Sequence, residues 1–209
     1  MRQLLICALL LAGCCYVDAC GFYLGAGTGW SDVELAITNK SAQGSATLKY
    51  SGSGPSDALL AGFRLKLSPE LFTALESHIQ LSGAKLKDTD NGDEFLIKQT
   101  SSFGIAALLG KNLGDGELYG RLGLQLANYK IVDKEAGFPE DDLEADTSHS
   151  GMRLGVGSAF AFGNNTRLRM DWSRTFYNKE QYNDDKDIGF SEFLQPTETV
   201  FLIGVIRQF

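Results

Sequence analysis

Side chains that bind transition metals are scarce in this chain. Its four cysteines all lie within the first 20 residues, and it contains two histidines. The rest of the chain therefore has no thiol for a disulfide framework or a thiolate metal site. The net charge of -7 argues against nucleic acid as a partner. We predict no metal site, no cofactor and no nucleic-acid binding.

Long apolar runs are also missing. After residue 19, no stretch approaches the about 20 consecutive apolar residues that a membrane-spanning helix needs. Residues 1–19 combine a basic residue, a short apolar run and small residues up to Ala19, which indicates a secretory signal peptide. The alternative is a lipoprotein signal over residues 1–13, with Cys14 lipidated. Cleavage after Ala19 leaves one exported domain, residues 20–209.

Proline is rare, with 4 residues, whereas glycine is common, with 24. Apolar side chains alternate with polar side chains or glycine in a series of segments. Because successive side chains of a strand point to opposite faces, each segment predicts a strand with one apolar face. The segments are residues 21–30, 57–67, 71–81, 101–111, 117–130, 151–162, 167–176 and 197–209. The series predicts an all-β fold, an eight-stranded antiparallel up-and-down transmembrane β-barrel.

The connections between these segments alternate in length. The short ones are 68–70, 112–116 and 163–165, and the long ones are 31–56, 82–100, 131–150 and 177–196. Outer-membrane barrels place short turns in the periplasm and long loops outside. We therefore predict four long extracellular loops and two periplasmic termini. In the first loop, the alternation of Val33, Leu35 and Ile37 indicates a hairpin that rises above the membrane.

Alternation alone does not say which face points inwards, because a lipocalin-like soluble barrel turns its apolar face to the interior. Charged side chains on the opposite face favour an apolar face towards lipid. The lumenal polar side chains are then Arg64, Glu76, His78, Arg121, Arg153, Arg169 and Asp171. An eight-stranded barrel is only wide enough for its side chains to fill it, and buried charges need partners.

We expect Glu76 and Asp171 to pair with some of these arginines, and the excess of arginine indicates either inner waters or further carboxylates near the rims. The result would be a structural plug, and the alternative is a narrow polar path for small solutes. Aromatic side chains near strand ends are typical of the girdles at both membrane surfaces. We assign to them Phe22, Trp30, Phe72, Tyr119, Tyr129, Trp172, Phe176 and Phe209. The last strand is the least regular, because Val200, Leu202 and Ile206 would face the lumen.

Four stretches carry a family resemblance: GFYLGAGTGW, LYGRLGLQLANYK, GMRLGVGSAFAF and the terminal GVIRQF. Over residues 20–209 the chain resembles the opacity-type, OmpA-like small outer-membrane β-barrels of Gram-negative bacteria. The resemblance implies contact with outer-membrane lipid and lipopolysaccharide. It also implies that the barrel-assembly machinery reads the terminal strand ending in Phe209. Function is less specified, because members of the family include adhesins and structural anchors.

Enzymatic chemistry has one candidate, the Ser148-His149-Ser150 stretch beside acidic residues, which would suit a lipid hydrolase. Its spacing matches no hydrolase motif, so we expect no enzyme and no catalytic residue. Acidic side chains in 131–150 and 177–196 suit either solvated loops or divalent cations. The leading hypothesis is a monomeric structural or adhesin-like module whose loops bind host or cell-surface ligands. A small-solute channel and a lipid-modifying enzyme are the alternatives.

Overall fold

The computed structural model describes residues 20–41, 44–90, 93–134, 143–185 and 190–209. Its strands are β1 (Cys20–Ser41), β2 (Gly44–Lys66), β3 (Leu71–Ser82), β4 (Lys85–Asp90), β5 (Asp93–Leu113), β6 (Gly116–Lys134), β7 (Leu143–Ala161), β8 (Thr166–Tyr177), β9 (Glu180–Asp185) and β10 (Phe190–Gln208). The predicted signal peptide and Cys14 lie outside the described residues. Within the described ranges, no helix is long and apolar enough to cross a membrane.

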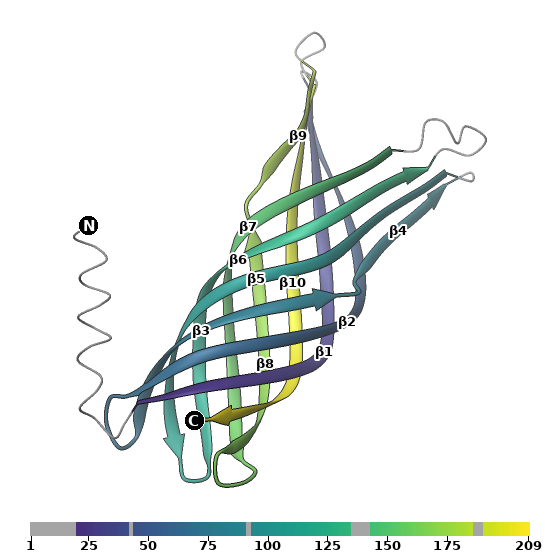
Figure 1. Cartoon of the computed structure of the whole chain (residues 1–209). Coiled ribbons are helices and arrows are strands. Elements are labelled where there is room, and N and C mark those ends of the chain that lie inside the picture. Colours follow the sequence, from purple (N-terminus) through teal and green to yellow (C-terminus); the bar gives the residue numbers. More distant parts are fainter. Residues whose placement is uncertain (1–19, 42–43, 91–92, 135–142, 186–189) are drawn as a thin grey trace, which may run out of the picture.

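The strands form one antiparallel sheet that closes on itself (Figure 1). The ring consists of β1, β2, β3, β5, β6, β7, β8 and β10. Closure comes from β1, which pairs with β2 on one side and with β10 on the other. After short interruptions, β4 continues the course of β3, and β9 that of β8. The predicted eight-stranded antiparallel barrel is confirmed.

Short turns join the strands at one end of the barrel, as predicted. The β5–β6 turn contains Gly114, whose φ of 68° is a left-handed conformation that favours glycine. The β2–β3 and β7–β8 turns span 67–70 and 162–165. Residues 20 and 209 lie at the same end (Figure 1), where the Phe209 N–H donates to the Phe22 carbonyl at 2.9 Å.

The prediction of long loops is wrong for most of their length in three of the four links, whereas the hairpin predicted in the first link is confirmed. Strand β1 continues to Ser41 and β2 begins at Gly44, so the first link is a strand hairpin. The other three links are likewise occupied largely by extensions of β4 to β7, β9 and β10. On β1, apolar side chains continue to point inwards beyond Trp30, the last exposed large apolar side chain of that strand, and Val33, Leu35 and Ile37 are all buried. This continued alternation keeps the chain in strands.

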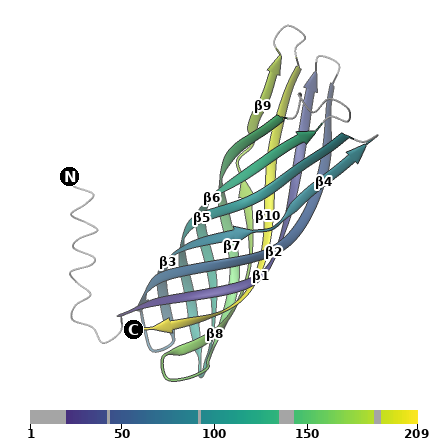
Figure 2. The same ribbon diagram turned by 45° about the vertical axis from the view of Figure 1, so that its right-hand side comes forward.

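Beyond the membrane level, the sheet divides into two parts that lean apart (Figures 1 and 2). One part is β9-β10-β1-β2, and the other is β4-β5-β6-β7. Among the described residues, β2 and β4 share the single pair Ser53–Lys85, and the pairing of β7 with β8 ends at Gly151 opposite Tyr177. The upper apolar cluster lies between them and comprises Val33, Leu35, Ile37, Ala84, Leu86, Ile97, Ala127, Tyr129, Ile131, Tyr177 and Leu194.

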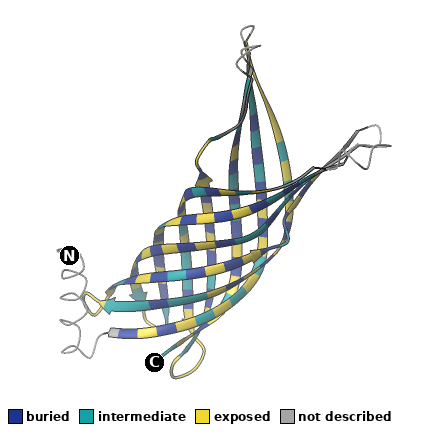
Figure 3. Ribbon diagram, turned by 45° about the horizontal axis from the view of Figure 1, so that its top comes forward, coloured by how far each residue is buried: buried dark blue, intermediate teal, exposed yellow. Residues whose placement is uncertain are grey.

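The outer face of the ring carries a belt of exposed apolar side chains, and exposed and buried positions alternate along each strand (Figure 3). On β3, for example, Leu75 and Ile79 are 65% and 54% exposed, whereas Glu76 and His78 are buried. A soluble barrel would have the opposite arrangement. The apolar face therefore points outwards, as predicted, and forms the lipid-facing belt of a transmembrane barrel. On β10, Val200, Leu202 and Ile206 are buried, also as predicted.

Three of the aromatic assignments are wrong, because Phe72, Tyr119 and Tyr129 are buried inside the barrel. The other five are exposed, as predicted: Phe22, Trp30, Trp172, Phe176 and Phe209. Tyr119 lies directly opposite Gly157, and Phe72 opposite Gly110. In both pairs the aromatic ring covers the glycine, so a Cβ on the glycine would overlap the ring. The missing side chain on the next strand makes room for a large inward ring.

Candidate functional site

The polar side chains of the lumen form three groups, which we call the lower, middle and upper groups, starting from the short turns. The middle group is centred on Glu76 of β3, which forms ion pairs with Arg121 of β6 and Arg169 of β8. Asp171 accepts two hydrogen bonds from Arg169, at 2.6 and 3.0 Å. Each buried carboxylate therefore has a charged partner, which offsets its loss of hydration.

Two tyrosines complete the middle group. The Tyr23 hydroxyl donates to Glu76 at 2.9 Å, and the Tyr119 hydroxyl donates to Asp171 at 2.8 Å. In each case a single strand lies between the tyrosine and the carboxylate: β2 between Tyr23 and Glu76, and β7 between Tyr119 and Asp171. Four strands that are not neighbours in the sheet, β1, β3, β6 and β8, are thus tied together by side chains.

The lower group surrounds Glu117 of β6, which forms ion pairs with Arg64 of β2 and Arg167 of β8. Arg64 Nη1 lies 2.6 Å from the carboxylate, and Nη2 donates to the Asn112 amide oxygen at 2.7 Å. The Arg64 guanidinium also lies 3.7 Å from the centre of the Phe72 ring, a cation–π contact. Arg64 therefore pairs with a carboxylate near the rim and not with Glu76 or Asp171.

The upper group joins Arg153 of β7 to Glu198 of β10 through two glutamines. Arg153 Nη1 donates to the amide oxygens of Gln80 and Gln125, at 3.2 and 2.7 Å. The amide nitrogens of the same glutamines donate to Glu198, at 2.8 and 3.2 Å. Arg153 also donates to Ser173 and His78, and Glu198 accepts from Tyr177 and Ser31. Among the described residues, no carboxylate lies within ion-pair distance of Arg153.

The predicted lumenal residues therefore divide among the three groups. The structure brings Glu76, Arg121, Arg169 and Asp171 together, but it places Arg64 in the lower group and Arg153 with His78 in the upper one. The predicted set lacks several members of these groups, among them Tyr23, Gln80, Glu117, Tyr119, Gln125, Arg167, Tyr177 and Glu198. The alternation of side chains indicates that they face the lumen. Glu117, for example, stands four residues before Arg121 and therefore lies on the same face of the strand.

Two hollows between described residues inside the barrel are small. A hollow between the lower and middle groups, beside Arg64 and Tyr119, has a volume of about 20 Å³. Another in the upper apolar cluster, beside Tyr129 and Leu194, has about 10 Å³. A cavity needs at least about 10–15 Å³ to hold one water. Neither hollow has room for a hydrated ion.

The Ser148-His149 pair does not form a catalytic arrangement. His149 is buried beside Tyr129, with ring centres 5.5 Å apart, whereas Ser148 lies on the outer face and donates to Asn128 at 2.7 Å. Nucleophile and base on opposite faces of one strand cannot share a proton. Burial lowers the pKa of His149 and favours the neutral ring, although Glu180 lies 3.6 Å away.

The acidic links 131–150 and 177–196 contain the carboxylates that could bind divalent cations. Among the described residues, no group of three or more His, Cys, Asp or Glu side chains could hold a metal ion. Residues 135–142 of the first acidic link and 186–189 of the second lie outside the described residues.

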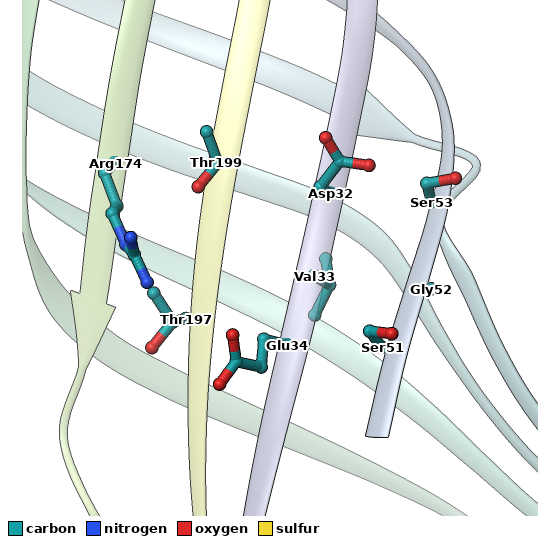
Figure 4. A pocket seen from close by; sticks show the side chains of 9 residues that line it. All are labelled: Asp32, Val33, Glu34, Ser51, Gly52, Ser53, Arg174, Thr197 and Thr199. Atoms are coloured by element: carbon teal, nitrogen blue, oxygen red, sulfur yellow. The ribbon is translucent and has the colours of Figure 1, made fainter. Parts of the chain in front are cut away.

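An open polar hollow of about 380 Å³ lies on the outer face, beyond the apolar belt (Figure 4). It is lined by Asp32, Val33, Glu34, Ser51, Gly52, Ser53, Arg174, Thr197 and Thr199. Arg174 comes from β8 and extends towards Thr197, while the two carboxylates come from β1. This mixture of charges suits polar groups at the membrane surface and not an apolar ligand.

The chain belongs to the family described as the outer membrane protein beta-barrel domain, whose model matches residues 5–209. Membership confirms the resemblance to small outer-membrane barrels and places the protein in the bacterial outer membrane. No curated protein matches the chain.

Solved structures agree with this fold. A major outer membrane protein from Thermus thermophilus is 16% identical, with 92% of this chain and 100% of that chain covered and a TM-score of 0.54. OprG from Pseudomonas aeruginosa is 13% identical, with 91% of this chain and 97% of that chain covered and a TM-score of 0.54. Neisserial surface protein A is 17% identical, with 90% of this chain and 97% of that chain covered and a TM-score of 0.47. At these identities the likeness to the Thermus protein and to OprG shows the fold alone.

Proposed function

We propose that the protein is a non-enzymatic surface-interaction module, in which a closed barrel anchors protruding hairpins that contact ligands at the cell surface. The observation that carries this proposal is the length of the strands beyond the apolar belt. On β1, residues 31–41 follow Trp30, the last exposed large apolar side chain of that strand. At about 3.3 Å per residue they extend roughly 35 Å along the strand.

The upper apolar cluster supports the same function, because it provides the protruding part with its own core. Val33, Leu86 and Ile97 are almost fully buried between the two parts of the sheet. A connection that only links strands needs no such core. Ordered hairpins hold their outward side chains in place, so less conformational entropy is lost when a partner binds.

The orientation we propose places the short turns and both residue 20 and residue 209 in the periplasm. It follows from the rule that outer-membrane barrels carry short turns inside and long extensions outside. The extensions of β1–β2, β4–β5, β6–β7 and β9–β10 then protrude from the cell.

The three lumenal groups favour the role of an anchor and argue against the role of a channel. Ion pairs cross the lumen at Glu117 and at Glu76, and hydrogen bonds cross it from Gln80 of β3 to Arg153 and Glu198. An ion entering this lumen would have to break buried charge pairs, each costing several kcal/mol, roughly 3–5 by analogy with other buried pairs.

A trimmed hairpin tests the proposal. Residues 38–47 would be replaced by Asn-Gly, joining Ile37 to Leu48, which lie opposite each other, and leaving the buried Val33 and Leu35 in place. Cells displaying the native or trimmed protein would be compared for binding to immobilised matrix proteins and glycosaminoglycans. We expect the native protein to bind at least one of them and the trimmed protein to lose that binding while still folding. Equal binding by both would contradict a role for this hairpin.

A further inference from the structure

The upper end of β2 is a strand edge that no neighbouring strand covers. Among the described residues, 45–52 of β2 pair with β1 alone, and β4 pairs with β2 only at Ser53–Lys85. Beyond that pair the two strands lean apart (Figures 1 and 2). An uncovered edge presents backbone N–H and C=O groups with which another extended chain can pair.

The backbone groups on this edge belong to particular residues. The Pro55 carbonyl accepts from the Gly83 N–H at 2.8 Å, so it points away from β1. Because backbone groups alternate in direction along a strand and the register of β2 with β1 is continuous, every second residue of β2 shares this direction. The residues above Ser53 whose N–H and C=O point away from β1 are therefore Ser45, Thr47, Lys49 and Ser51.

Three further edges flank the divided sheet in the described part of the chain, and each is protected. Strand β4 reads KLKDTD, with four charged residues of six, and β9 reads EQYNDD, with three acidic residues. The upper part of β7, which pairs with β6 alone, contains Glu144 and Asp146. Short length and charged side chains discourage pairing with another strand. Residues 45–52 of β2, SATLKYSG, contain a single charge, Lys49, which Glu34 compensates at 3.0 Å.

Apolar side chains accompany the edge on the inner face of β2. Leu48 lies opposite the buried Ile37, and thus on the same inner face, yet it is 52% exposed. Tyr50, two residues further on, packs against the upper apolar cluster and is partly buried. The outer face of the same segment carries serine and threonine hydroxyls around Lys49. A strand that paired here would place apolar side chains beside Leu48 and Tyr50, and polar side chains on the outer face.

We propose that the edge of β2 over residues 45–51 binds an extended segment of a partner polypeptide, which adds to the sheet as a further strand. Backbone hydrogen bonds to residues such as Thr47 and Lys49 supply affinity, and alternate side chains supply specificity. The bound segment therefore alternates apolar and polar residues. This inference rests on the surface-interaction role proposed above, and it narrows the ligand of the first hairpin to a polypeptide.

The test compares two double variants of the full mature chain, refolded in a neutral detergent. Thr47→Pro with Lys49→Pro removes two N–H groups that point away from β1, and proline is tolerated on an edge strand where its nitrogen faces solvent. The matched control, Thr47→Ala with Lys49→Ala, loses the same side chains and the same Lys49–Glu34 pair but retains both N–H groups. Leu48→Lys is a second test variant, because an inward charge blocks strand pairing and leaves the backbone unchanged. Retained electrophoretic mobility of the folded form shows which variants fold.

The probe is a fluorescent peptide of alternating threonine and valine with glutamates at both ends, and its binding is followed by fluorescence anisotropy. A peptide of the same composition without the alternation is the control. We expect saturable binding of the alternating peptide to the native protein and to the alanine variant. The proline variant and Leu48→Lys should bind it at least about tenfold more weakly than the alanine variant, because backbone hydrogen bonds or strand pairing are lost.

Absence of saturable binding to the native protein, or equal binding by the alanine variant and the folded test variants, would overturn strand addition. A dimer of the native protein that the test variants do not form would assign the edge to a second copy of the chain and overturn the assignment to a partner polypeptide. The trimmed hairpin is measured separately on cells. If trimming abolishes surface binding while the peptide does not bind, the surface-interaction role stands and strand addition fails.

Discussion

Arg153 and Glu198 are coupled through shared hydrogen-bond partners without forming a direct ion pair with each other. Gln80 and Gln125 stand between them, and each accepts from the guanidinium with its amide oxygen and donates to the carboxylate with its amide nitrogen. Two oriented amide dipoles therefore connect a buried cation to a buried anion. The arrangement compensates both charges where no direct ion pair is made, and through Gln80 it connects β7 and β10 to β3 on the other side of the lumen.

The first prediction concerns this coupling. Arg153→Met should lower the free energy of unfolding by about 3–5 kcal/mol, because it leaves a buried carboxylate without its compensating charge. In a double-mutant cycle with Glu198→Gln, the interaction energy should be at least about 1 kcal/mol, although the two side chains do not touch. Urea unfolding of the refolded protein in lipid provides the measurement. The exposed Lys49–Glu34 pair, 3.0 Å apart, is the control and should give no more than about 1 kcal/mol. An interaction energy near zero for Arg153 and Glu198 would contradict their coupling through Gln80 and Gln125, which we call the glutamine relay.

The second prediction concerns Glu76. Glu76→Gln removes the shared partner of Arg121 and Arg169 and should destabilise the barrel by about 3–5 kcal/mol. Glu70→Gln is the matched change on the surface, where the carboxylate is exposed and pairs with Lys111 at 3.1 Å. It should cost less than about 1 kcal/mol in the same urea titration. Similar costs for the two changes would show that the middle group contributes little.

The third prediction concerns the rings that cover glycines. Gly157→Ala places a methyl group against the Tyr119 ring and should destabilise the protein by about 1–3 kcal/mol through overpacking. Gly120→Ala is the control, because nothing lies within 4 Å of its Cβ position. The temperature at which the folded form is lost on gels, measured for both variants, distinguishes them. A stable Gly157→Ala protein would mean that Tyr119 has room to move.

The fourth prediction is a pH dependence. Burial lowers the pKa of His149, so the folded state favours the neutral ring. Its contribution to stability is complete above the ordinary histidine pKa of about 6.5 and is lost as the pH falls from there towards the lowered pKa. The native protein should therefore lose thermal stability on acidification from pH 7, and His149→Gln should lose less. Parallel curves for the two proteins would assign the pH dependence to other groups.

The alternation of side chains predicted which residues of the lumen face inwards, but not how they pair. Glu76, Arg121, Arg169 and Asp171 were predicted inside on their phase alone. Their partners depend on the register between strands, which one sequence does not reveal. This is why Arg64 was not assigned to Glu117 and why the glutamine relay from Arg153 was not foreseen.

The type of a residue predicted the position of its side chain less well than its place in the alternation along the strand. Phe72, Tyr119 and Tyr129 were assigned to the girdles because aromatic side chains are common there, although their phase placed them inside. The extent of the strands was also underestimated, because side chains such as Leu35 and Ile37 were read as part of a loop hairpin and not as the start of a second core. In both cases the period-two pattern carried the correct information.

Planar-bilayer conductance of the refolded protein tests the closed lumen most directly. Insertion would be verified first, by the folded mobility of protein recovered from the bilayer lipid. Ion pairs at Glu117 and Glu76, with the Arg153–Glu198 relay above them, predict a flat trace with at most rare, small openings. A steady conductance from inserted protein would contradict the closed lumen and would make the arginine-lined interior a path for solutes.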